Sequence, residues 1–227
     1  MVTHLRWDLK QIFDMAVAEG KVKLNPAVLL FTPRNAAKAG RRSMGIGECG
    51  KLFEQLDLRE RLIAKLAVIA GMRPGEIFAL TWDDVGEMYV EVRRRVYEGV
   101  LDSPKSEKGC RRVALAKSVL IDLSAWKEFC ADIRGFVFPS EAGTPLSKNN
   151  VWRRNMRLKL KRVGLEWCNF QVMRRTHATL MKGLNADPKL VSDQMGHTLD
   201  VNQNVYTQSS VEMRLPLVNT LDEAVLR

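Results

Sequence analysis

The sequence is poor in the residues that build metal centres and disulfide frameworks. Its four cysteines include no Cys-x-x-Cys pair, and its three histidines form no cluster with the spacing of metal ligands. A structural zinc site and a disulfide scaffold are therefore not expected, and scattered cysteines are typical of a protein kept in a reducing compartment. We expect neither a metal nor another cofactor.

Long apolar runs, internal repeats and low-complexity tracts are missing as well. No apolar stretch approaches the roughly eighteen residues of a membrane span, and no signal peptide opens the sequence, so no membrane partner is expected. The 227 residues, of which 46% are hydrophobic, can bury the core of one domain of ordinary size with a small appendage.

Acidic residues are outnumbered by basic ones. The formal charge is +10 and the isoelectric point is near 9.7, which indicates a large polyanion as the partner. Nucleic acid is the first candidate and an anionic membrane surface the second. Together with the cysteine usage, the charge predicts a cytoplasmic protein that handles DNA.

Residues 1–42 are predicted to form one helix followed by an irregular segment. Thr3 is the expected cap of the helix and Gly20 its end. One apolar face cannot make a domain alone, so the helix needs a packing partner. The face consists of Leu5, Leu9, Ile12, Phe13 and Ala16.

Residues 43–227 are predicted to form a compact domain. Gly71 suits the left-handed residue that ends a helix, and Asp187-Pro188 and Gly196 are typical of the start and end of a short helix. A further short helix is expected around Tyr206, and a last amphipathic helix carries Met213, Leu217, Leu221 and Val225. The other expected helices are 47–56, 58–70, 74–80, 117–131, 148–163 and 171–181, and the expected strands are 89–92, 93–96 and 111–115.

The stretch from Gln171 to Tyr206 contains an ordered set of polar residues. Arg174 lies three residues after Gln171, Gly196-His197 follows about twenty residues later, and Tyr206 stands nine residues after His197. This order and spacing resemble the C-terminal signature of the tyrosine recombinases, the phage-integrase family. Gln171 departs from the signature, because a histidine usually occupies its position.

Two earlier motifs extend the resemblance over nearly the whole chain. The sequence Gly71-Met-Arg73-Pro-Gly-Glu76 is similar to the family's first arginine motif, Gly-x-Arg-x-x-Glu. Lys105, in a loop before the strand that starts at Arg111, is similar to the family's hairpin lysine. Each motif is weak alone, but the ordered set is specific.

The resemblance implies a mixed α+β fold, mainly helical, with a small three-stranded antiparallel sheet. Residues 1–42 would be the last helix of a truncated core-binding domain plus its linker, and residues 43–227 the catalytic domain with its C-terminal helix. An ordinary first helix of a single domain remains the alternative for residues 1–42. The final helix, 211–227, would pack either on a neighbouring protomer or on its own domain.

The implied chemistry breaks a DNA phosphodiester without a metal. Arg73 and Arg174 would bind the non-bridging oxygens, since planar guanidinium donors match phosphate, and Glu76 would orient Arg73. A surface ion pair with Glu76 is the structural alternative for Arg73. Gln171 would donate a hydrogen bond to the phosphate but, unlike histidine, cannot take up a proton.

The remaining catalytic candidates would supply the nucleophile, the general acid and a further phosphate contact. Tyr206 would be the nucleophile, although only about one phenol in a thousand is ionised at pH 7. Lys105 would be the general acid for the leaving 5′-oxygen, with Lys108 as the rival, and His197 would bind a phosphate oxygen or position Tyr206. The structural alternatives are a packing tyrosine at Tyr206, solvated loop lysines at Lys105 and Lys108, and a helix-capping histidine at His197.

Basic side chains outside the motifs are candidates for contact with the DNA backbone. Those on the 148–163 helix lie away from its apolar face, which contains Trp152, Met156, Leu160 and Val163. The candidates are Arg153, Arg154, Arg157 and Lys161 on this helix and Arg41 and Arg42 in the linker.

The sequence therefore predicts a site-specific recombinase that integrates or excises a mobile element through a 3′-phosphotyrosyl intermediate. Its partners would be double-stranded DNA, three further copies in a homotetramer on two duplexes, and DNA-bending or directionality proteins. A non-catalytic, recombinase-derived DNA-binding protein is the alternative that Gln171 favours. A type IB topoisomerase is a third hypothesis, but the motifs match integrases more closely.

Overall fold

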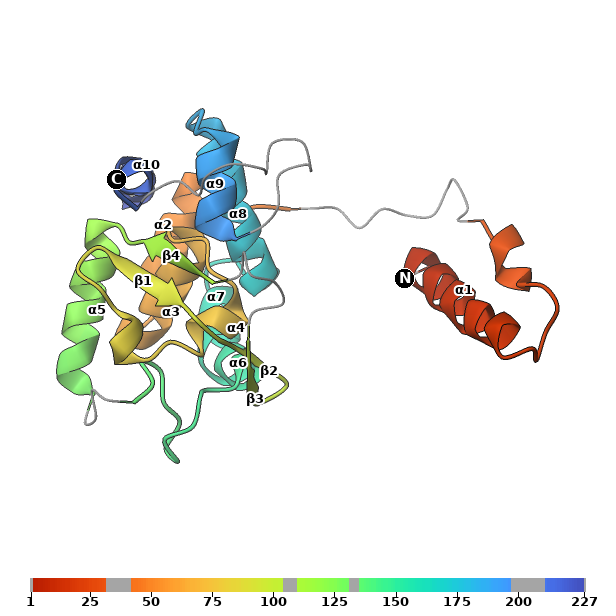
Figure 1. The fold of residues 1–227 in the computed structure, drawn as a ribbon. Coiled ribbons are helices and arrows are strands. Elements are labelled where there is room, and N and C mark those ends of the chain that lie inside the picture. Colours follow the sequence, from red (N-terminus) through yellow and green to blue (C-terminus); the bar gives the residue numbers. More distant parts are fainter. Residues whose placement is uncertain (1, 32–41, 104–109, 131–134, 197–210, 227) are drawn as a thin grey trace. The chain divides into compact units, whose positions relative to one another are not determined.

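The computed structural model describes residues 2–31, 42–103, 110–130, 135–196 and 211–226 (Figure 1). The chain divides into an N-terminal unit, Met1–Arg41, and a C-terminal unit, Arg42–Arg227. The assignment of the N-terminal unit to a core-binding domain and its linker stays a prediction.

The N-terminal unit consists of helix α1 (Val2–Ala18) and the short 3-10 helix η1 (Pro26–Leu29). The predicted cap at Thr3 is wrong, because α1 already begins at Val2. Asn25 caps η1 by accepting from the Ala27 N–H (2.8 Å), and its amide donates to the Lys10 carbonyl (2.9 Å), which ties the turn to α1. Most large apolar side chains of this unit are exposed, among them Trp7, Leu24, Leu29 and Phe31.

Helix α3 (Leu58–Val68) is the centre of the C-terminal unit. It is buried among α2 (Ile46–Glu54), α5 (Lys117–Phe129) and α8 (Phe170–Gly183), and Leu62, Ile63 and Leu66 are fully enclosed (Figure 1). Gly71 follows α3 with φ +69°, as predicted. The next helix, α4 (Pro74–Ile77), ends before the predicted Leu80, and the 3-10 helix η2 (Trp82–Asp84) follows.

The predicted mainly helical fold with a small antiparallel β component is confirmed, but the prediction of one three-stranded sheet is wrong. The described residues form two antiparallel pairs: β1 (Tyr89–Val92) with β4 (Arg111–Ala114), and β2 (Arg95–Tyr97) with β3 (Val100–Asp102). Arg93 and Arg94 lie in the chain between β1 and β2 and belong to neither strand pair, and their side chains form ion pairs with Asp84 of η2. β3 was not predicted, because all three of its side chains are exposed and it shows no buried alternation.

The basic segment after residue 147 is one continuous helical stretch with an irregular middle. It runs through α6 (Lys148–Asn150), a π-helical segment η4 (Val151–Met156) and α7 (Arg157–Lys161), where a single regular helix was predicted. The division into faces is confirmed: Met156 and Leu160 are buried and Trp152 is half-buried. The four basic residues Arg153, Arg154, Arg157 and Lys161 are exposed.

Helices α8 and α9 (Pro188–Met195) begin with side-chain caps. Asn169 accepts from two N–H groups in the first turn of α8, and Asp187 accepts from the Lys189 N–H (2.6 Å) as the sequence predicts. Gly196 ends α9 in the left-handed conformation, with φ +64°. The helix expected around Tyr206 lies outside the described residues.

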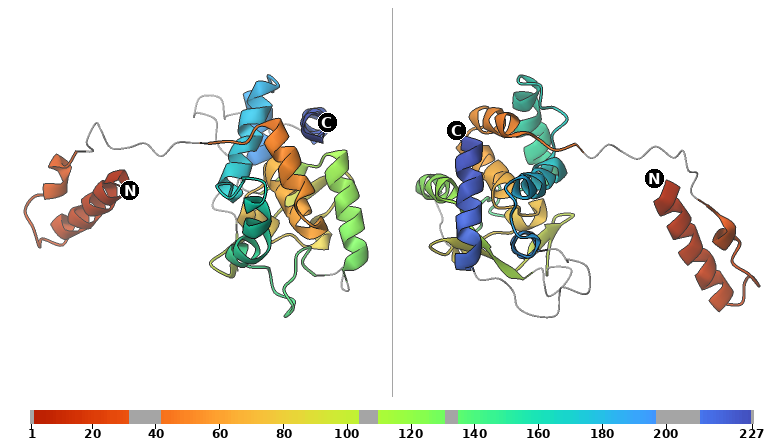
Figure 2. Two further views of the ribbon diagram at one scale, coloured as in Figure 1. Left: turned by 180° about the vertical axis from the view of Figure 1, so that it is seen from behind. Right: turned by 90° about the horizontal axis from the view of Figure 1, so that it is seen from above.

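Helix α10 (Val211–Leu226) packs on its own domain, which is one of the two predicted placements. It contacts β4, α2 and α9 and lies beside α5 (Figure 2). Val218, Leu221 and Val225 are buried, Leu217 is half-buried, and the side chain of Met213 lies outside the described part of the chain.

Two side chains of α10 complete the N-terminus of α5. The N-cap residue of α5 is Ala116, whose methyl group cannot accept a hydrogen bond. Asn219 accepts from the Lys117 N–H (3.3 Å), and Asp222 accepts from the Ser118 N–H (3.2 Å) and the Ser118 hydroxyl. A carboxylate at this end also interacts favourably with the helix dipole.

Asp222→Ala is expected to lower the free energy of unfolding by about 1 kcal/mol, the usual cost of removing a helix cap. The neighbouring Glu223 is exposed, so Glu223→Ala serves as the matched control and should change stability little. Urea denaturation of both variants measures the difference. Equal stability of the two variants would contradict the capping role of Asp222.

Candidate phosphate-binding site

Three arginines meet at the last turn of α9. Arg111 Nε donates to the Gln194 carbonyl (3.0 Å), and Arg174 Nη2 donates to the Met195 carbonyl (2.6 Å). Arg73 donates to the Met195 carbonyl (3.3 Å) and to the Gly196 carbonyl (2.6 Å). The last carbonyls of a helix lack intrahelical partners and carry partial negative charge, so they attract cations.

The turn after α3 contains one of these arginines and binds a second. Arg73 precedes α4 directly, and Arg174 lies in the second turn of α8 and donates through Nη1 to the Gly71 carbonyl. The left-handed Gly71 also leaves room for the buried ring of His177, which a Cβ would approach to 2.8 Å. The structure therefore brings together the predicted pair Arg73 and Arg174, which are 101 positions apart in the sequence.

Glu76 lies between two of the guanidinium groups. It accepts from the Arg73 N–H (2.9 Å) and Arg73 Nη1 (2.8 Å), and it forms a two-bonded pair with Arg111 (3.0 and 2.9 Å). Burial raises the pKa of this carboxyl, but the hydrogen bonds and charge of Arg111 and the bonds from Arg73 outweigh burial and hold the pKa below its usual value.

Arg111 and Gln194 were not singled out by the sequence, although both are buried at the centre of the cluster. The Gln194 amide donates to the Ala70 (3.2 Å) and Ala114 (2.9 Å) carbonyls, and its oxygen accepts from the Ala114 N–H (3.1 Å) and Arg214 Nη1 (3.3 Å). One signal was available for Arg111: it shares a strand face with the buried Val113.

The cluster holds an excess of positive charge, with three guanidinium groups around one carboxylate. Burial, together with the charges of Arg73 and Arg111, lowers the pKa of Arg174 to about 9, although Glu76 partly opposes this shift. The Arg73 side chain is 41% exposed, so the cluster reaches solvent. A site of this kind favours an anion with several acceptor oxygens, such as a phosphate group.

Of the remaining predicted catalytic residues, only Gln171 is described. It is exposed in the first turn of α8, three residues before Arg174 and so on the same side of the helix. Lys105, His197 and Tyr206 lie outside the described residues. Gly196, whose carbonyl binds Arg73, directly precedes His197.

Arg42, one of the two predicted linker arginines, already binds other residues of the protein. Arg42 stacks on the Trp167 ring, with Cζ 3.4 Å from the ring centroid, and pairs with Glu48 (3.2 Å). Its carbonyl accepts from Arg175 Nη1 (2.8 Å). A DNA contact would therefore have to share the Arg42 guanidinium with protein partners. Arg41 lies outside the described residues.

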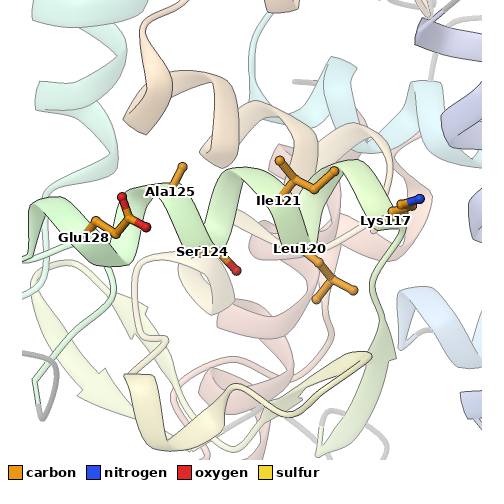
Figure 3. A pocket seen from close by; sticks show the side chains of 6 residues that line it. All are labelled: Lys117, Leu120, Ile121, Ser124, Ala125 and Glu128. Carbon is orange, nitrogen blue, oxygen red and sulfur yellow. The ribbon is translucent and has the colours of Figure 1, made fainter.

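Other features of the described residues point to no second reaction centre. A shallow depression lies along α5, and none of its lining residues belongs to the arginine cluster; they are Lys117, Leu120, Ile121, Ser124, Ala125 and Glu128 (Figure 3). No group of three or more potential metal ligands occurs within the described ranges. No helix in the described part of the chain is long and apolar enough to cross a membrane.

Solved integrase structures share this fold. The chain superposes on the integrase of transposon Tn1549, in complex with circular intermediate DNA, with a TM-score of 0.70 and 18% identity, covering 91% of this chain and 75% of that one. A lambda integrase dimer bound to a core site gives a TM-score of 0.62 and 24% identity, with 90% and 74% covered.

Sequence comparison identifies the family. A tyrosine recombinase XerC-like protein of Caldanaerobacter subterraneus is 25% identical over 95% of this chain and 64% of its own length. The ICEBs1 integrase of Bacillus subtilis is 26% identical over 93% and 63%, so the chain spans less than two thirds of either relative. The model of the phage integrase family matches residues 46–213, which include all the predicted catalytic positions. The chain belongs to the phage integrase family.

Proposed function

We propose that this chain cuts and rejoins DNA at specific sites, for integration or excision of a mobile element. The observation that carries the proposal is the convergence of Arg73 and Arg174 on one acceptor, the Met195 carbonyl. Two guanidinium groups that lie side by side and are partly open to solvent can bind the two non-bridging oxygens of a phosphodiester.

The proposed reaction needs no metal. The Tyr206 phenol loses its proton to solvent water and attacks phosphorus, the bond to the 5′-oxygen breaks, and Lys105 gives the leaving oxygen a proton. The product is a 3′-phosphotyrosyl link and a 5′-hydroxyl, and the reverse attack by a 5′-hydroxyl of another strand rejoins the DNA. Arg73, Arg174, His197 and Gln171 stabilise the negative charge at phosphorus during both steps.

The exposed arginines and lysine of η4 and α7 form a surface that can follow the DNA backbone. Similar solved chains include a lambda integrase tetramer bound to a Holliday junction, which supports DNA as partner and a tetramer as the working assembly here. DNA-bending or directionality proteins and a cytoplasmic, nucleoid-associated location belong to the same proposal.

The test is covalent trapping on nicked DNA. The substrates are a randomised pool of duplexes with a nick next to the cleaved position. Cleavage releases a short fragment that carries the 5′-hydroxyl needed for rejoining, so the protein stays covalently attached to the DNA. The adduct is then detected by its retention in denaturing gels. We expect a covalent adduct that forms equally in EDTA. Duplex binding without any adduct would instead favour the second candidate, a non-catalytic DNA-binding protein, for which Gln171 is the motivating observation.

Gln171→Ala is expected to slow adduct formation about 10²–10³-fold, the usual cost of losing a preorganised donor to developing negative charge. Gln171→His should remain active, because its ring can donate from the same turn of α8. Timed trapping of each variant measures the rates. An unchanged rate in Gln171→Ala would contradict the hydrogen-bond role, and activity in Gln171→His alone would show that the natural chain is a decayed enzyme.

A further inference from the structure

Arg111 connects three parts of the candidate site that are distant in the sequence. It lies on β4 and is bound to Glu76 of α4 and to the carbonyl of Gln194 at the end of α9. Resting on the proposed function, we infer that Arg111 is a positioning residue that sets the geometry of the two phosphate-binding arginines without touching DNA itself.

The contacts require the shape of a guanidinium group. Two parallel N–H donors face both oxygens of Glu76, while Nε points to a third acceptor, the Gln194 carbonyl. A lysine ammonium keeps the charge but is a single point, so it cannot make a planar pair with a carboxylate and reach a separate carbonyl. Lysine at position 111 should therefore preserve the charge and lose the geometry.

The C-terminal end of α9 packs closely against the Arg111 side chain. A Cβ on Gly196 would lie 2.6 Å from Arg111 Cζ, so the guanidinium packs directly against the glycine backbone. Arg111 and the last turn of α9 therefore support each other's position through direct contact. The same turn supplies the Met195 and Gly196 carbonyls that hold Arg73 and Arg174.

Two routes thus lead from Arg111 to the phosphate-binding side chains. The first passes through Glu76, which binds both Arg111 and Arg73. The second passes through the last turn of α9, which binds all three arginines. Because Arg111 is buried, its effect on the reaction would be indirect, through the placement of Arg73 and Arg174.

The first experiment needs no DNA. In nitrogen-15 NMR of arginine side chains, guanidinium groups held by hydrogen bonds rotate slowly and give separate Nη signals. In the natural chain we expect each of Arg73 and Arg174 to give two separate Nη signals. In Arg111→Lys, the two Nη signals of Arg73 should merge into one. The matched control is Arg112→Lys, on the same strand but exposed, which should leave these signals unchanged. Unchanged Arg73 signals in a folded Arg111→Lys variant would overturn the inference.

The second experiment measures trapping rates on two substrates. Arg111→Lys should slow adduct formation about 10²-fold, the scale expected for a displacement of about 1 Å at a catalytic group. The defect should shrink when the scissile phosphate is replaced by an uncharged methylphosphonate, which needs less neutralisation by Arg73 and Arg174. A mere loss of folded protein would slow both substrates equally, and that result would overturn the inference.

The two proposals can fail separately. If the natural chain forms no adduct on any DNA, the proposed function fails, while the NMR comparison still decides whether Arg111 positions Arg73. If the natural chain forms adducts and Arg111→Lys matches it in rate, the function stands and the positioning role is excluded.

Discussion

Glu76→Ala is expected to lower the free energy of unfolding by about 3–5 kcal/mol. The carboxylate is 4% exposed, and it neutralises the buried guanidinium of Arg111 while binding Arg73. Removing one member of a buried ion pair leaves the other charge in the interior without compensation, which costs more than the pair itself contributed. Chemical denaturation at pH 7 measures the loss.

The pH dependence of this loss follows from the lowered pKa of Glu76. A carboxyl whose pKa is lower in the folded state stabilises the protein above its unfolded pKa, and that contribution disappears as the pH falls through the folded value. The stability gap between the natural chain and Glu76→Gln should therefore be full at pH 7 and narrow in acid below about pH 4. Glu91→Ala, which removes a half-buried carboxylate from β1, is the control. A gap that does not change with pH would contradict the ion-pair explanation.

Lys105→Ala is expected to slow DNA cleavage about 10²–10⁴-fold, the range that a general acid contributes. The leaving 5′-oxygen is a poor leaving group unless it receives a proton. If sulfur replaces that oxygen, the leaving thiolate needs no proton, so the variant should cleave the sulfur-substituted DNA at nearly the rate of the natural chain. Trapping rates on both substrates measure this rescue.

Lys108→Ala provides the control for this assignment, because Lys108 lies three residues away in the sequence. It should cleave ordinary DNA normally and gain nothing from sulfur. Rescue of Lys108→Ala instead of Lys105→Ala would transfer the role of general acid to Lys108. Absence of rescue in both variants would mean that neither lysine protonates the leaving oxygen.

The features that the sequence predicted correctly depend on local signals. Gly71 and Gly196 adopt the left-handed conformation expected at helix ends, and Asp187 caps α9 as its place before Pro188 indicates. The paired position of Arg73 and Arg174 followed from the resemblance to a family, since nothing in local periodicity relates residues so far apart.

The features that the sequence did not reveal depend on tertiary contacts. The strand pattern around Arg111 does not indicate its role, because its acceptors lie 35 and 83 positions away. In place of the single predicted sheet there are two strand pairs, and the chain between β1 and β2 holds Arg93 and Arg94, whose side chains bind Asp84. Asn219 and Asp222 of α10 bind the N-terminus of α5, which lies about a hundred residues earlier in the chain.

Tyr206 is the residue that we propose becomes joined to DNA. Digestion of the trapped adduct and mass spectrometry of the DNA-linked peptide identify that residue directly. We expect the natural chain to carry the 3′-phosphate on Tyr206, and Tyr206→Phe to bind duplex DNA with the same affinity and form no adduct. A DNA-linked peptide that does not contain Tyr206, or an adduct that persists in Tyr206→Phe, would contradict the account.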